Sequence, residues 1–214
     1  MSVLWIIAAG LLVVVLYVLL EIRKIGTPTK GPQIDRAART GIALVVIDMQ
    51  SDFTSLPVWE AAQLETAIEN IRTSADVARR AGMPVIAVRQ VYKAGLARLL
   101  NGWFNQGRGN AGSPGIGLDP RLSRVPDIEF EKSMGDAFSE PALERYLEEN
   151  RIGTLILMGL DGCHCVKNTA FGALNRGYAV RIDPATVLAA DEAGWSKVQQ
   201  NLTAAGAEMS ATAA

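Results

Sequence analysis

Histidine and cysteine are scarce in this chain, and their scarcity narrows the possible chemistry. Among 214 residues there is one histidine, His164, and there are two cysteines, Cys163 and Cys165. A papain-like pair of a cysteine and a distant histidine is therefore excluded. His164 is itself a poor base for Cys165, because adjacent side chains usually point in different directions. If Cys165 is a nucleophile, its base has to be a carboxylate.

The same scarcity leaves little material for a metal site or a disulfide. Cys163, His164 and Cys165 are soft ligands, but no further cysteine or histidine exists to complete a coordination shell. A disulfide between cysteines so close together would close a small, strained loop and could not staple distant parts of a secreted fold. We therefore expect no metal, no cofactor and two free thiols in a reducing compartment.

A surplus of basic charge is also missing. Lys and Arg total 21 and Asp and Glu total 22, which gives a formal net charge of −1. No excess is left to neutralise phosphates, so we expect no nucleic-acid partner. The length allows one or at most two domains, and an apolar fraction of 49% is enough for one sizeable core.

Charge is absent altogether from residues 3–20, VLWIIAAGLLVVVLYVLL. As a helix this run would extend about 27 Å, close to the roughly 30 Å hydrocarbon core of a bilayer. A buried core helix and a cleaved signal peptide are the alternatives. We predict a transmembrane anchor over 1–22, embedded in the lipid bilayer through 3–20, and a linker over 23–40. Basic residues follow the run, so the positive-inside rule predicts a single-pass membrane protein with its catalytic domain on the cytoplasmic side.

The chain after residue 40 alternates short apolar runs with helical patterns, which is typical of a parallel α/β sheet. We predict a three-layer α/β/α domain over 41–206 with a mostly parallel, doubly wound sheet, followed by a flexible tail over 207–214. The expected strands are 42–47, 85–88, 128–130, 154–158 and 178–182, and the expected helices are 59–80, 140–150 with Ser139 as its cap, 165–176 and 192–205.

Three residues with useful chemistry fall at the ends of predicted strands. Asp48 follows the first strand, Lys132 the third, and Cys165 comes a short turn after the fourth. Because parallel strands end at one edge of their sheet, where ligands bind in such folds, these side chains are expected to converge.

Each of the three also has an ordinary explanation. Cys165 opens a predicted helix, whose amino terminus lowers a thiol pKa and can hold an oxyanion, but many free thiols are inert and buried. Asp48 could serve as a base, or it could cap a helix or form a buried salt bridge. Lys132, taken alone, could be a surface lysine.

These residues resemble the isochorismatase-like hydrolase superfamily, which includes nicotinamidases, N-carbamoylsarcosine amidases and ureidoacrylate amidases. The similarity runs from about Ala43 to Asp183. It is carried, in order, by Ala43–Phe53, by Phe130–Lys132 with Asp136–Phe138, by Gly159–Val166 with Thr169–Ala170 and Gly177–Tyr178, and by Asp183.

The resemblance implies a mechanism. Asp48 would take the proton of Cys165, assisted by Lys132, and the thiolate would attack an amide-type carbonyl. The backbone N–H groups of Asp161 and Cys165 would hold the oxyanion, and the Leu160–Asp161 peptide would be cis. Relatives usually self-associate, so a homo-oligomer is expected.

Substrate contacts are predicted at Gln50, Phe53 and Arg89, with Lys93 and the 96–118 loop lining the pocket by position.

Departures from the family pattern refine this expectation. Residues 89–93, RQVYK, contain no histidine, so they support neither a nicotinamidase nor a metal. True isochorismatases typically lack the nucleophilic cysteine, so Cys165 argues against vinyl-ether hydrolysis. Gly162 and Cys163 stand where the family often has Thr-Asp.

Two functions are compatible with these patterns. The first is a membrane-anchored cysteine hydrolase that cleaves an amide-type C–N bond of a small molecule through a thioester on Cys165, with an Asp48–Lys132–Cys165 triad. The second is a non-catalytic subunit of the same fold that joins a membrane protein complex.

Overall fold

The computed structural model of this chain describes residues 2–210. Its centre is a six-stranded sheet in the order β3-β2-β1-β4-β5-β6, and every adjacent pair is parallel. Residues 211–214, the end of the predicted tail, lie outside the described part. The strands are β1 Gly41–Ile47, β2 Val85–Gln90, β3 Ile128–Lys132, β4 Ile152–Leu160, β5 Ala179–Leu188 and β6 Glu208–Met209.

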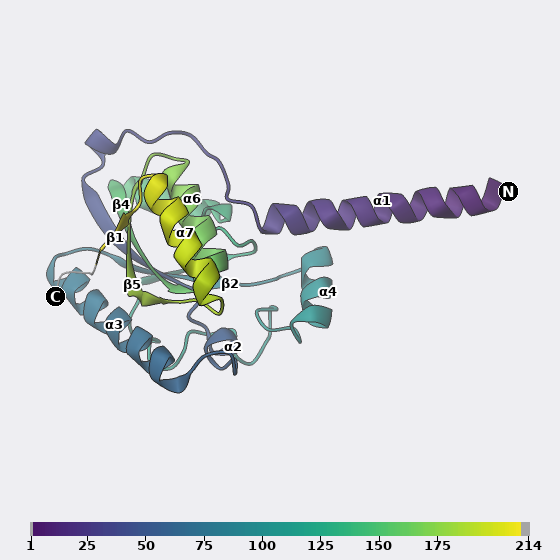
Figure 1. The fold of residues 1–214 in the computed structure, drawn as a ribbon. Helices are drawn as coiled ribbons and strands as arrows, with labels where there is room; N and C mark the ends of the chain where they lie inside the picture. Colours follow the sequence, from purple (N-terminus) through teal and green to yellow (C-terminus); the bar gives the residue numbers. More distant parts are fainter. Residues whose placement is uncertain (1, 211–214) are drawn as a thin grey trace.

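Helices cover both faces of this sheet, as the sequence predicts (Figure 1). Helix α3 (Ala61–Arg80) packs its buried residues against one face. Helices α5 (Pro141–Glu149), α6 (Lys167–Leu174) and α7 (Glu192–Ala204) pack on the other. The strand β1 is apolar on both sides, with alternate residues in the two cores, because it is buried on both faces. The three-layer α/β/α architecture is therefore confirmed.

The strand order reverses direction between β1 and β4, which are neighbours in the centre of the sheet. Ile47 of β1 is paired with Gly159 of β4 in the register. Gly159 has φ +112°, and a Cβ there would collide with the carbonyl oxygen of Ile47, so only glycine fits this position. The crevice at such a reversal is the usual ligand site of an open α/β sheet.

Some local features differ from the prediction. Cys165 does not open an α-helix: it lies inside a π-helical turn, Gly162–Val166 (η3), that runs into α6.

The cap of α5 is Glu140, whose carboxylate accepts from the N–H of Ala142, whereas the Ser139 hydroxyl donates to the Asp136 carbonyl. The short helix α2 (Ser51–Thr54), helix α4 (Gly95–Phe104) and β6 were not predicted. The 3₁₀ turns are η1 (Arg36–Ala38) and η2 (Ala137–Ser139).

The amino-terminal helix α1 (Ser2–Ile25) extends away from the α/β domain (Figure 1). A membrane span needs about twenty consecutive apolar residues in one helix. Among residues 2–210, no helix combines the length and the hydropathy that crossing a membrane requires. The predicted transmembrane anchor and bilayer partner over 3–20, and with them the single-pass membrane localisation, are therefore wrong.

Part of the predicted linker is bound to the domain. Thr29 donates from both its N–H and its hydroxyl to the buried carboxylate of Asp136, at 2.7 Å each. Arg176 donates to the Thr29 hydroxyl at 2.9 Å, and its carbonyl accepts from the N–H of Ile34 at 2.8 Å. These contacts fix where the chain that follows α1 meets the α/β domain.

Candidate active site

The structure brings together the three residues that sequence order placed at one edge of the sheet. The ammonium of Lys132 donates to Asp48 Oδ2 at 2.8 Å and to Cys165 Sγ at 3.3 Å. The Asp48 and Lys132 side chains are almost completely buried. An acid, an amine and a thiol from three strand ends therefore form one contact group.

Backbone geometry at the end of β1 positions Asp48. Its φ is +54°, a left-handed conformation that aspartate tolerates better than most residues. Its N–H donates to the Val88 carbonyl at 2.8 Å, and its own carbonyl accepts from the N–H of Gln50 at 2.7 Å. Within the described chain, Asp48 Oδ1 is buried without a hydrogen-bond partner. One carboxylate oxygen thus binds Lys132, and the other remains able to accept a proton.

Lys132 is the last residue of β3, and its buried charge is balanced by acceptors. In addition to Asp48, its ammonium donates to Gln90 Oε1 at 2.7 Å and to the Met134 carbonyl at 3.2 Å. Burial opposes the charge, but the Asp48 carboxylate and the Cys165 sulfur outweigh it and raise the pKa of Lys132. Lys132 therefore stays cationic at neutral pH.

The pKa of the thiol differs from the sequence-based expectation. Burial, and after it the Asp48 carboxylate, raise the pKa of Cys165 to about 12, although the Lys132 charge acts in the opposite direction. A helix amino terminus was expected to lower this pKa, but Cys165 lies within a π-helical turn beside a buried carboxylate. The resting side chain of Cys165 is therefore a thiol, and any attack by it would require a base.

The turn that carries Cys165 is braced by Asp161. The Leu160–Asp161 peptide is cis, as the resemblance implied. The Asp161 carboxylate accepts from the N–H of Cys163 at 2.6 Å and from the N–H of Ala190 at 3.1 Å. This side chain ties the turn to the segment after β5, although Gly162 and Cys163 replace the more common Thr-Asp.

The three predicted substrate contacts lie in different surroundings. Gln50 is fully buried, and its amide is paired with the backbone of Gln90 and with the Ile116 carbonyl. Phe53 lies against Gly109, where its ring would contact an added Cβ.

Arg89 is not brought to the triad. It pairs with Glu129 at 2.8 Å and with Glu131 at 3.1 Å. Arg89 is opposite Glu131 in the register, whereas Gln90 is opposite Lys132, so these two pairs face opposite sides of the sheet.

Sequence reasoning missed two residues of the site, Gln90 and Tyr92. Gln90 is 3% exposed, and its amide contacts Lys132 twice: Oε1 accepts from the ammonium and Nε2 donates to the carbonyl at 3.3 Å. Burial, and after it the Cys165 sulfur, raise the pKa of Tyr92 to about 12, so its phenol interacts electrostatically with this group. Gln90 ends a buried strand just as Asp48 does, so the rule that found Asp48 could have found it.

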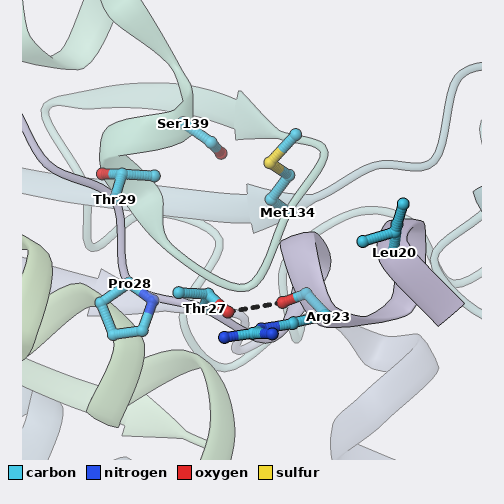
Figure 2. A pocket seen from close by; sticks show the side chains of 7 residues that line it. All are labelled: Leu20, Arg23, Thr27, Pro28, Thr29, Met134 and Ser139. Atoms are coloured by element: carbon cyan, nitrogen blue, oxygen red, sulfur yellow. Dashed lines mark hydrogen bonds between the residues drawn. The ribbon is translucent and has the colours of Figure 1, made fainter.

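A cavity of about 530 Å³ lies between the end of α1 and the segment after β3 (Figure 2). Arg23 and Leu20 line it from α1, and Met134 and Ser139 from the opposite side. Met134 also accepts from the ammonium of Lys132 through its carbonyl, but Asp48, Lys132 and Cys165 do not line this cavity. Among the described residues, no three His, Cys, Asp or Glu side chains gather closely enough to hold a metal ion.

Comparison with known proteins identifies relatives with this fold. The family model described as "Isochorismatase domain" matches residues 42–214. "Nicotinamidase 3" of Arabidopsis thaliana is 30% identical over 145 residues, which cover 64% of this chain and 68% of that protein. "N-carbamoylsarcosine amidase" of an Arthrobacter species is 29% identical over 132 residues, which cover 58% of this chain and only 50% of that enzyme.

Among solved structures, a nicotinamidase from Bacillus subtilis aligns with a TM-score of 0.70 at 23% identity. The alignment covers 79% of this chain and 98% of that one. At this identity the likeness shows a shared fold.

Proposed function

The chain belongs to the isochorismatase domain family, and we propose that it is a cysteine hydrolase that cleaves an amide-type C–N bond of a small molecule. One observation carries the proposal: a single buried ammonium, Lys132, is within hydrogen-bond distance of both the Asp48 carboxylate and the Cys165 sulfur. The named relatives include a nicotinamidase and an N-carbamoylsarcosine amidase, which supports an amide-type substrate.

The proposed reaction begins with proton transfer. Asp48 takes the proton from Cys165 Sγ as the sulfur attacks the carbonyl carbon, and Lys132 stabilises the negative charge that develops. The C–N bond breaks when Asp48 returns the proton to the leaving nitrogen, which leaves a thioester on Cys165. Asp48 then deprotonates a water that attacks the thioester, and the thiol is regenerated with a carboxylic acid product.

A thiol pKa of about 12 fits this sequence of steps. A thiolate formed in advance would need little help, whereas a protonated thiol depends on the base throughout its attack. The backbone N–H groups of Asp161 and Cys165 are the proposed donors to the oxyanion, on a turn that the Asp161 side chain braces. Preorganised donors stabilise this charge without moving during the reaction.

Arg89, which the sequence analysis assigned to the substrate, is a weaker candidate because two glutamates already bind its guanidinium. Tyr92 is the stronger candidate for substrate contact, because it interacts electrostatically with Cys165, and Phe53 joins it because both rings lie against Gly109. The cavity of about 530 Å³ beside Met134 is lined by none of Asp48, Lys132 and Cys165, so the substrate is not assigned to it.

The test combines covalent capture with turnover. The purified chain is incubated with a panel of primary amides and ureido compounds, and with an electrophilic amide analogue. Intact-mass spectrometry should show one adduct, on Cys165, that is absent from Cys165→Ala and still formed in the matched variant Cys163→Ser.

A wild-type chain with no adduct and no turnover of any amide would overturn the hydrolase proposal. It would favour the alternative prediction of a non-catalytic subunit, which keeps the fold without the chemistry.

A further inference from the structure

Helix α4 is an arm that leaves the domain directly beside the candidate active site. It occupies Gly95–Phe104 between β2 and β3, and none of its residues is buried. Figure 1 shows it standing apart from the sheet and from the helices that cover the sheet. An isolated helix of ten residues is marginal in water, so its stability has to come from contacts elsewhere.

Hydrogen bonds close the base of this arm. Tyr92 donates from its N–H to the Gly109 carbonyl at 2.8 Å, and its carbonyl accepts from the N–H of Ala111 at 3.1 Å. The Asn101 amide donates to the Arg108 carbonyl at 2.6 Å. The direction of the arm is therefore set by the end of β2, where Gln90 contacts Lys132.

The arm carries an apolar stripe with helical spacing. Its members are Leu96, Leu99, Leu100, Trp103 and Phe104, at positions i, i+3, i+4, i+7 and i+8, which defines one face of a helix. Leu99 is 61% exposed, Trp103 81% and Phe104 83%. An amphipathic helix normally buries this face against another element, and here its outer half has no partner within the described chain.

This exposure is unusual for the protein. The described residues include thirteen exposed large apolar side chains, of which nine lie on α1, three on α4 and only Val58 elsewhere. On α1 they surround the helix, as the consecutive Leu11, Leu12 and Val13 show, so one neighbouring helix could not cover them. On α4 they form one stripe, which a single helix can cover.

We propose that this stripe pairs with the same stripe of a second copy of this chain, about a two-fold axis. Full burial removes about 150–250 Å² for each Trp or Phe, so these two residues and Leu99 offer roughly 500 Å² per copy. Two copies then bury about 1,000 Å² in total, which reaches the lower limit for a specific interface. A two-fold pairing needs no second patch, because each copy presents the same surface.

Charge is compatible with this self-pairing. Arg98 is the one charged residue of α4, and it lies outside the stripe. Its guanidinium donates back to the Lys93 carbonyl at 3.2 Å, at the base of the arm. Two stripes can therefore meet without bringing like charges together.

Sedimentation velocity on the full chain tests the interface. Wild type should sediment as a dimer at about 10 µM, and Trp103→Glu/Phe104→Glu should sediment at half that mass. The matched control is Val58→Glu, which adds a charge at the exposed apolar residue outside both helices and should stay dimeric. Circular dichroism should be unchanged in all three. A monomeric wild type, or equal masses for wild type and the double variant, would overturn the proposal.

Cross-linking gives a second readout, because two chains that associate through α1 would not bring their α4 stripes together. In a Cys163→Ser background, Trp103→Cys should form a disulfide-linked dimer on mild oxidation, whereas Val58→Cys should not. Equal dimer yields at the two positions would overturn the proposal. So would a chain that is monomeric in buffer and binds phospholipid vesicles through Trp103 and Phe104, because the stripe would then serve a lipid surface.

Discussion

The end of β2 and the arm that follows it depart from the usual partition of residues in opposite ways. Gln90 and Lys132 are polar and at most 3% exposed, whereas Trp103 and Phe104 are apolar and more than 80% exposed. Soluble folds ordinarily bury apolar residues and expose charged ones. Gln90, a buried polar residue, and Trp103, an exposed apolar residue, are only thirteen positions apart.

The difference teaches what each region needs in order to be stable. Buried polar groups are stable only when paired, and Lys132 is paired with three oxygens and the Cys165 sulfur. Exposed apolar groups have no partner within the fold and can be buried only by another molecule. The first region is complete within one chain and fits chemistry, and the second is incomplete and fits association.

The largest expected effect comes from removing the thiol from the buried region. Cys165→Ala should lower amide turnover by about 10⁴-fold or more, because the covalent route is lost. Its effect on folding should be small, since the side chain is only partly buried where it packs against the core and the change removes a single sulfur. Steady-state kinetics with urea denaturation checks both. Retention of more than a tenth of the wild-type rate would show that Cys165 is not the nucleophile.

Breaking the buried ion pair should affect stability more than breaking any exposed pair. Lys132→Met leaves the Asp48 carboxylate buried without its cation and should cost about 3–5 kcal/mol of unfolding free energy. Arg181→Met, which removes the exposed pair with Glu208, should cost less than about 1 kcal/mol. Urea unfolding monitored by circular dichroism compares them. Similar losses would contradict the burial argument.

A change at Gln90 tests whether its two hydrogen bonds to Lys132 also position the Lys132 ammonium. Gln90→Leu keeps the size but removes both contacts to Lys132, so kcat should fall about 10- to 100-fold while KM changes little, equivalent to about 1.4–2.7 kcal/mol. Gln63→Leu, on the exposed side of α3, is the matched control and should leave both constants unchanged. A rise in KM alone would assign Gln90 to substrate binding instead.

The smallest expected effect is the change in the labelling rate of Cys165 with pH. With the pKa of Cys165 raised to about 12, the thiolate fraction increases about tenfold per pH unit and does not level off below pH 10. In a Cys163→Ser background, iodoacetamide labelling of Cys165 should follow that slope from pH 7 to pH 10. A plateau near pH 8 would show a lowered pKa.

The sequence was sufficient wherever a pattern has one structural solution. The β-branched run ending at Ile47 can only be a buried strand, and parallel strands can only end at a common edge. Asp48, Lys132 and Cys165 therefore converge as their order predicted. Hydrophobic periodicity likewise predicted α3, α5 and α7 to within a few residues.

Other properties depend on the surroundings of a residue, which the sequence does not contain. The uncharged run at 3–20 predicted a membrane span that the structure does not support. Residues 96–118 were predicted as a loop, whereas helix α4 covers the first part of this range, and the outer half of its stripe has no partner within the described residues.

The amino-acid sequence by itself determined the sheet, the edge at which its strands end and the three side chains gathered there, because periodicity and strand direction are local properties. Only the tertiary structure decided that Gln90 holds Lys132 and that the Cys165 thiol is protonated at rest. The physical reason is that a pKa and a hydrogen bond are set by burial and by neighbouring charges, and Lys132 and Cys165 are 33 positions apart in the chain but 3.3 Å apart in space.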